Sequence, residues 1–295
     1  MLEEVPAKTI VNRTKDSQWF GTDYIMNIYR GCSHGCIYCD SRSDCYHIEN
    51  FQKIRVKKDA LRIIRNDLQR KARTGVVATG SMSDPYNPFE KDLELTRHGL
   101  ELLDAYGFGV AAATKSSLIT RDIDILTEIR THSPVLCQIT ITTPKDSLSS
   151  QIEPYAPLAS QRFAAVEALS KANLFTGLLL MPVLPFLEDD PESILTLVDR
   201  AADSGAKFIY ASFGVTMRPG QREYFLSQLG NLFPALPQKY ERKYGNRYFC
   251  PVPKAKELWE QFSGRCKEKG ILYEMKDIIS AYKMEYEGNQ LTFYS

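Results

Sequence analysis

Short apolar runs alternate with longer segments of helical period between residues 75 and 215. This alternation is typical of strand and crossover-helix units around a parallel sheet. Each apolar run is short enough for one buried strand, and each longer segment has room for one amphipathic helix. The pattern predicts six strands, at residues 25–29, 76–79, 109–114, 135–142, 176–183 and 208–213.

Helical candidates fall between the predicted strands. Phe163, Val166 and Leu169 recur at helical spacing in one of them, and Pro191 suits the first turn of another. Residues 233–253 are rich in proline and tyrosine and are predicted to be irregular. The predicted helices span 58–73, 92–106, 121–130, 157–172, 191–204 and a closing helix at 254–270, followed by a strand-like tail at 271–295.

Six strand and helix units in series indicate an α/β barrel or partial barrel rather than a sandwich. In such folds the reactive groups lie on loops at the carboxyl ends of the strands. We therefore expect three parts: an N-terminal segment over 1–23, a barrel over 24–232, and a C-terminal extension over 233–295 that packs on the barrel.

The overall charge excludes a global attraction to polyanions. The 295 residues include 37 basic and 36 acidic side chains, so the formal net charge is only +1. The first ten residues lack the basic and apolar regions of a secretory signal, and no run approaches the roughly 20 apolar residues of a membrane span. We expect a cytoplasmic protein without a membrane partner.

Four of the seven cysteines lie between Cys32 and Cys45, and three of them form the motif Cys32-Ser-His-Gly-Cys36-Ile-Tyr-Cys39. In a reducing compartment such a group indicates metal or redox chemistry. Thiolates prefer iron–sulfur clusters or zinc, and three of them would leave one iron of a four-iron cluster open. The alternatives are a structural zinc site with a fourth ligand, or three inert buried cysteines. The candidates for that fourth ligand are Cys45, His34 and His47.

This motif resembles the signature of the radical S-adenosylmethionine superfamily, in which Tyr38 would be the aromatic residue before the last cysteine. The resemblance implies a partial (βα)6 barrel of the TIM type. It also implies a 4Fe-4S cluster bound by Cys32, Cys36 and Cys39, with S-adenosylmethionine chelating the open iron. An electron, from a donor such as flavodoxin or ferredoxin, would then yield a 5′-deoxyadenosyl radical that abstracts hydrogen from a substrate.

Residues 24–215 more closely resemble the spore photoproduct lyase family, also described as DNA repair photolyase-like. The resemblance rests on Gly31-Cys32 and on short blocks at 79–86, 114–116, 139–143, 153–154 and 180–182. By this resemblance Ser83, Lys115 and Thr140 match the family's contacts to S-adenosylmethionine. A nucleic acid or nucleotide substrate is implied by the same resemblance.

The chemistry of the side chains near these blocks supports cofactor binding. Hydroxyl and carboxylate groups after the second strand suit an amino group or a ribose, and a lysine suits a carboxylate. Thr140 and Thr142 alternate onto one face of their strand and are predicted to bond ribose hydroxyls. The full predicted set of cofactor contacts is Tyr38, Ser81, Ser83, Asp84, Lys115, Thr140 and Thr142.

Three functions remain open at this stage: a radical enzyme with an unidentified substrate, a DNA lesion repair lyase, and a non-catalytic zinc- or cluster-binding protein. In spore photoproduct lyase a cysteine after the second strand returns hydrogen to the product, assisted by a tyrosine after the third cluster cysteine. The matching residues here are Ser81 and Asp40. Because an O–H bond is too strong to replace an S–H donor, we expect no efficient repair of the spore lesion. Asp40 adds a carboxylate near the cluster that could orient a polar substrate.

Two basic segments lie outside these motifs. Nine basic residues fall within 53–73, where acidic residues interrupt them, and a solvated helix face is the favoured interpretation. Residues 239–249 interleave cations with aromatic rings, which is found on nucleic-acid surfaces and also in partly buried loops. Cys45, Cys137, Cys250 and Cys266 are expected to play no part in cluster binding.

Overall fold

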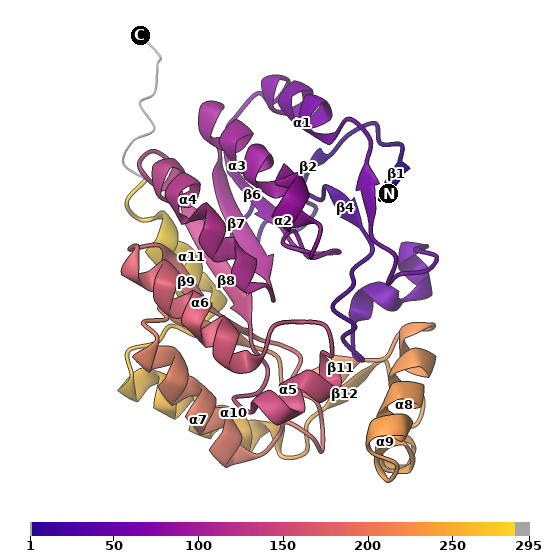
Figure 1. The fold of residues 1–295 in the computed structure, drawn as a ribbon. Helices are drawn as coiled ribbons and strands as arrows, with labels where there is room; N and C mark the ends of the chain where they lie inside the picture. The colour runs from indigo at the N-terminus through magenta and orange to yellow at the C-terminus, as the bar shows by residue number, and fades with distance from the viewer. Residues whose placement is uncertain (1, 287–295) are drawn as a thin grey trace.

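The computed structural model describes residues 2–286, and its centre is a curved seven-stranded sheet (Figure 1). Six neighbouring strands are parallel, and β2 adds an antiparallel strand at one edge. In order across the sheet the strands are β10 (Phe208–Ala211), β9 (Phe175–Leu180), β8 (Val135–Thr140), β7 (Gly109–Thr114), β6 (Val76–Thr79), β3 (Tyr24–Met26) and β2 (Val11–Arg13).

Helices that connect consecutive strands cover the outer face of the sheet, as Figure 1 shows. They are α1 (Ala60–Gln69), α2 (Glu90–Leu93), α3 (Leu95–Ala105), α4 (Ile123–Arg130), α5 (Asp146–Ile152), α6 (Ala159–Lys171) and α7 (Pro191–Asp203), while α10 (Ala255–Glu268) packs beside α7. The remaining helices are α8 (Gln221–Leu232), α9 (Leu236–Tyr244) and α11 (Met275–Lys283).

Two small sheets flank the barrel. One contains β1 (Glu3–Val5), β5 (Arg55–Lys57) and β4 (Tyr29–Arg30), and the other pairs β11 (Gly214–Thr216) with β12 (Phe249–Pro251). The first sheet leads directly into the cysteine motif. The second sheet lies near the same carboxyl edge of the barrel (Figure 1). The two sheets therefore border the region where strand-end chemistry is expected.

Alternation along the strands separates two apolar layers. Val110 and Ala112 of β7 face the helices and belong to the main core, as do Cys137 and Ile139 of β8. Ala111 and Leu136 point to the inner face and belong to another cluster. Because successive side chains point to opposite faces, one sheet contributes to both cores.

The inner face at the amino ends of the strands is covered by α11 and by Phe20. Ile278 and Tyr282, four residues apart on one helical face, pack there with Phe208 and are almost completely buried. The Tyr282 hydroxyl donates to the carbonyl of Phe20 at 2.6 Å. An open sheet would otherwise leave this apolar face in water, so α11 completes the fold.

The predicted partial barrel is confirmed, with two of its strands, 76–79 and 109–114, confirmed to the residue. The strands predicted at 135–142, 176–183 and 208–213 and the helices at 58–73, 92–106, 121–130, 157–172, 191–204 and 254–270 are present with shifted ends. Over residues 2–286, no helix has the length and apolar composition that crossing a bilayer requires.

Four expectations about local structure are wrong. The predicted strand 25–29 is two strands, because Lys57 N donates to the carbonyl of Ile28 and draws the chain into the smaller sheet. The strand ending at 142 stops at Thr140. Residues 233–253 contain α9 and β12, since Tyr240 and Tyr244 share one buried helical face. The strand-like tail contains α11, and its residues 287–295 lie outside the described part of the chain.

Replacing Ile278 by alanine tests the role of α11 in closing the barrel. The side chain is fully buried, so the change should lower the free energy of unfolding by about 2–5 kcal/mol. Ile279→Ala is the matched control, because its side chain is only partly buried and should cost less. Chemical denaturation of both variants measures the difference. Equal losses would contradict the assigned packing.

Candidate active site

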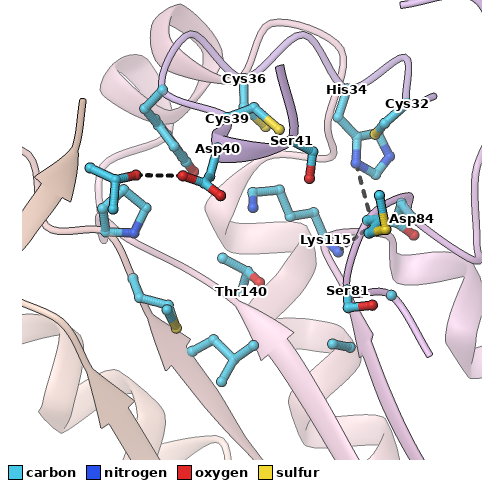
Figure 2. Close-up of a pocket in the computed structure, with 18 of the residues that line it drawn as sticks. Cys32, His34, Cys36, Cys39, Asp40, Ser41, Ser81, Asp84, Lys115 and Thr140 are labelled. Carbon is cyan, nitrogen blue, oxygen red and sulfur yellow. Dashed lines mark hydrogen bonds and ion pairs between the residues drawn. The ribbon is translucent and has the colours of Figure 1, made fainter. Parts of the chain in front are cut away.

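A pocket of about 400 Å³ opens at the carboxyl ends of the barrel strands. Figure 2 shows the cysteine side chains on one side of it and the strand-end residues on the other, with Lys115 between them. The two-stranded sheet of β11 and β12 contributes Thr216 and Phe249 to the wall. The predicted residues that line it are Cys32, Cys36, Tyr38, Cys39, Ser81, Ser83, Asp84, Lys115 and Thr140.

The cysteine motif forms a loop that backbone contacts hold against the barrel. Gly31 has φ +84°, and a Cβ there would lie 2.6 Å from the carbonyl oxygen of Lys53, so glycine is required. Cys32 N donates to the carbonyl of Phe51 at 2.9 Å, and Ile37 N donates to that of Ile152 at 3.0 Å. These contacts place all three thiols on the pocket wall.

Burial raises the pKa of all three thiols, that of Cys32 to about 12. Such thiols remain protonated unless a metal displaces the proton. Within residues 2–286, no three His, Cys, Asp or Glu side chains converge closely enough to hold a single ion. Three separated thiols around an open pocket therefore suit a cluster of several irons better than a single zinc ion.

The candidates for a fourth zinc ligand are exposed or already paired. Cys45 is exposed and accepts hydrogen bonds from Ser43 and from Arg218, at 3.2 and 3.4 Å. His34 Nδ1 lies 3.3 Å from Asp84 Oδ2, and His47 is exposed. Three thiols and no fourth protein ligand match the donor set of a cluster with one open iron.

Asp84 holds the ends of two strands together rather than offering a free carboxylate. Its Oδ1 accepts from Thr114 Oγ1 at 2.6 Å and from Tyr86 N at 2.9 Å, while Oδ2 accepts from Lys115 N at 2.8 Å. His34 approaches the same carboxylate (Figure 2). Asp84 therefore positions the backbone from which the Lys115 side chain extends.

Lys115 reaches across the pocket toward the cysteine loop. Its Nζ lies 3.8 Å from Glu153 Oε1 and 5.6 Å from the centre of the Tyr38 ring. Burial acts to lower the pKa of Lys115, but Cys36, in its ionised form, and the Glu153 carboxylate outweigh it and raise the pKa overall. The side chain is therefore a fixed cation beside the thiols.

Behind Lys115 lies an almost fully buried ion pair of Glu153 and Arg162, each side chain 1% exposed. Burial acts to raise the pKa of Glu153, but Arg162 and Lys115 lower it overall, so the carboxylate is ionised. The Tyr38 hydroxyl donates to Glu153, and Arg162 Nη1 donates to the carbonyl of Thr140 at 2.9 Å. The pair thus connects the cysteine loop with the end of β8.

The predicted hydroxyl contacts have different surroundings. Ser81 lines the pocket and is exposed, and Thr140 lines it from the end of β8. Ser83 Oγ donates to the carbonyl of Tyr29 at 3.0 Å and ties the pocket floor to β4. Thr142 is outside the lining and lies beside Glu188, because β8 ends at Thr140 and the alternation does not continue.

Asp40 links the cysteine loop to the β11–β12 sheet. Its Oδ1 accepts from Thr216 Oγ1 at 2.8 Å, its Oδ2 accepts from the Tyr46 hydroxyl at 3.0 Å, and Arg218 Nε lies 3.1 Å from Oδ1. Figure 2 shows the first of these contacts. The carboxylate that we expected to orient a substrate is occupied by the protein itself.

Glu188 is a second buried carboxyl group near the site. It is 3% exposed, its Oε2 accepts from Leu184 N at 2.9 Å, and burial raises its pKa to about 8. Its neighbour Glu153 adds to this shift. Glu188 is therefore mostly uncharged at neutral pH, whereas Glu153 is ionised.

Several site residues were missed by the sequence interpretation. Arg162 occupies a buried position of α6 in line with Val166 and Leu169, and a charged residue in an apolar stripe is a signal that could have been used. Glu188 had no such signal. Thr216 and Phe249 enter the pocket from β11 and β12, two short strands that showed no strand pattern in the sequence.

The family model of the radical SAM superfamily matches residues 26–198, which is more than half of the chain. This chain belongs to the radical SAM superfamily. It is therefore a radical SAM enzyme, and its cofactors are a 4Fe-4S cluster and S-adenosylmethionine. The matched range includes all three pocket cysteines and the strand ends that face them.

Relatives of this radical SAM enzyme occur in distant organisms. It is 28% identical over 262 residues to an uncharacterized protein of Mycobacterium tuberculosis, covering 86% of this chain and 76% of that protein. An uncharacterized protein of Methanocaldococcus jannaschii is 31% identical over 190 residues, covering 63% of this chain and 69% of that one.

Solved structures confirm the radical SAM fold. Spore photoproduct lyase complexed with dinucleoside spore photoproduct has a TM-score of 0.64 at 16% identity, covering 92% of this chain and 81% of that one. A radical S-adenosylmethionine methyltransferase of Kitasatospora setae, with cobalamin and a 4Fe-4S cluster bound, has a TM-score of 0.53 at 12% identity. It covers 97% of this chain and 57% of that one.

Replacing Glu188 by glutamine tests its buried, uncharged state. Unfolded Glu188 loses its proton near its ordinary pKa of 4.5, whereas the folded group keeps it up to about 8. The wild-type stability should therefore fall relative to the variant as pH rises from about 5 to 8, because the unfolded chain binds fewer protons there. Thermal unfolding across this range, with exposed Glu192→Gln as control, measures the gap. A gap independent of pH would contradict the assignment.

Proposed function

We propose that Cys32, Cys36 and Cys39 bind the 4Fe-4S cluster and that S-adenosylmethionine occupies the pocket in front of them. When both are bound, reduction supplies a 5′-deoxyadenosyl radical that abstracts hydrogen from a substrate. The observation that carries this proposal is the placement of three thiols opposite Lys115 across one pocket.

In this proposal the protein's side chains bind and orient S-adenosylmethionine. Lys115 pairs with the methionine carboxylate, since its cation is held at the pocket centre by Asp84 and by the Glu153–Arg162 pair. Thr140 and Ser81 offer hydroxyl groups to the nucleoside part. Tyr38 packs its ring beside Lys115 and closes the wall next to the thiols.

The substrate enters from the side of the β11–β12 sheet. Phe249, 41% exposed, lines the pocket there and leaves an apolar contact for a ligand, while the Thr216 hydroxyl beside it is held by Asp40. A nucleic acid or nucleotide is the proposed substrate class, in keeping with the dinucleoside bound to the spore photoproduct lyase of similar fold. Repair of the spore lesion itself is disfavoured because Ser81 offers no S–H bond.

Alanine replacement of any one pocket cysteine should abolish cluster binding, because two thiolates are too few anchors. Iron analysis after anaerobic reconstitution should give about four irons per chain for the wild type and far fewer for Cys36→Ala. Cys250→Ala is the matched control, since its thiol is also buried but lies outside the pocket. The same samples, reduced with dithionite, are assayed for 5′-deoxyadenosine. Four irons in Cys36→Ala would refute the assignment.

Replacing Lys115 by alanine should weaken S-adenosylmethionine binding while leaving the cluster in place. A charged hydrogen-bonded contact of this kind is worth roughly 1.5–3 kcal/mol, or about ten- to a hundredfold in affinity. Titration of the reconstituted protein with the cofactor measures the loss. Lys145→Ala, an exposed lysine beyond the next strand, should bind as the wild type does. Unchanged affinity in Lys115→Ala would remove it from the cofactor site.

A further inference from the structure

The proposed function requires an electron from outside, and the reverse side of the cysteine loop packs against helices that reach the protein surface. The pocket side of that loop is taken by cofactor and substrate. On the other side Ile37 and Tyr38 belong to the same buried cluster as Phe225 and Tyr240 of the α8–α9 hairpin. In Figure 1 these two helices lie together beside the two-stranded sheet of β11 and β12.

Aromatic rings fill the space from the cysteine loop to the protein surface. Tyr240 contacts Phe225, Phe186 and Tyr244, with ring centres 5.4, 5.4 and 5.6 Å apart. The Tyr240 hydroxyl donates to the carbonyl of Pro185 at 3.0 Å, which fixes the column to the loop after β9. Side chains in van der Waals contact therefore separate the cluster loop from this surface.

The outer end of this column is a hollow of about 720 Å³ with a cationic rim, which we call the α9 hollow. Phe186 and Asp189 line it together with Lys239, Arg242 and Lys243. Lys239 Nζ lies 4.2 Å from the centre of the Phe186 ring. All three cations are exposed, so the rim offers three positive charges against one carboxylate.

These cations have no carboxylate within 4 Å among residues 2–286, where the observed ion pairs involve other lysines and arginines. The basic segment 53–73 differs, because Lys53 pairs with Glu3 at 2.6 Å and Arg62 with Asp59 at 2.8 Å. Since the whole chain has a net charge of only +1, the rim of the α9 hollow carries a local excess of positive charge.

We propose that the α9 hollow is the docking surface for a small acidic protein that carries one electron. The donor would be oxidised by one electron and the cluster reduced by one, with no bond made or broken. A positive patch steers an acidic partner into place and raises its association rate. The proposal rests on the function proposed above and identifies the partner of that same site.

A nucleic acid is the less suitable occupant of this surface. Tyr240 and Tyr244 are 1% and 4% exposed, so they cannot stack on bases, which only one of the two interpretations of segment 239–249 would require. The exposed rings Tyr248 and Phe249 lie at the start of β12, and Phe249 borders the pocket rather than the hollow. The Phe186 ring that lines the hollow lies 4.2 Å from Lys239 Nζ, so the rim presents cations rather than a row of open rings, and this favours an acidic protein.

The test compares charge reversal at two surfaces of the reconstituted full chain. One variant combines Lys239→Glu, Arg242→Glu and Lys243→Glu. The control combines Arg62→Glu and Arg65→Glu on α1 with Arg70→Glu directly after it, which gives the same change in net charge at the far end of the molecule in Figure 1. Stopped-flow absorbance follows cluster reduction by chemically reduced flavodoxin at low and high ionic strength.

The α9 variant should be reduced about tenfold more slowly or worse at low salt, and the difference should shrink at high salt. The control should keep the wild-type rate, and all three proteins should give equal 5′-deoxyadenosine with dithionite. If charge reversal prevents folding, the corresponding glutamine triple variant replaces it and should show a smaller loss in the same direction.

A wild-type rate in the α9 variant, or an equal loss in the control, would overturn the docking surface. So would a variant that loses affinity for a labelled single-stranded oligonucleotide but accepts electrons normally. If dithionite yields no 5′-deoxyadenosine even in the wild type, the proposed function fails. The reduction rates then still decide whether flavodoxin uses the α9 hollow.

Discussion

The buried ion pair of Glu153 and Arg162 fixes the geometry of the site. Two charges that are 1% exposed are costly to remove from water unless every remaining lone pair and proton has a partner. Here those partners are Tyr38 of the cysteine loop and the carbonyl of Thr140 at the end of β8, with Lys115 nearby. Movement of the loop or of either strand end would leave a buried charge without a partner, so the pocket keeps one arrangement.

The same pair sets the charge that the thiols face. Lys115 and Arg162 contribute two positive charges and Glu153 one negative charge, which leaves a positive excess next to the cysteine loop. Glu188 would cancel this excess if it were ionised, but burial holds its pKa at about 8. Since thiolate-bound clusters carry negative charge, an uncharged Glu188 and a charged Lys115 favour the same bound state.

The sequence predicted the parts of the molecule that depend on local pattern. Strands such as 76–79 and the order of helices follow from periodicity, and the three cysteines and Lys115 follow from a motif and from strand ends. It did not predict features that depend on distant contacts. The turn of the chain at Ile28, the partner that buries Glu188, and the face that α11 covers are decided by residues far away in sequence.

The C-terminal third of the chain completes what an open barrel lacks. Six parallel strands that do not close leave the inner face exposed at both ends. At the amino end α11 covers the apolar residues with Ile278 and Tyr282. At the carboxyl end the β11–β12 sheet is held to the cysteine loop by the hydrogen bond from Thr216 to Asp40. The amino end is thereby filled and the carboxyl end left as a pocket, so an incomplete barrel provides room for a large cofactor where a closed one would be packed with side chains.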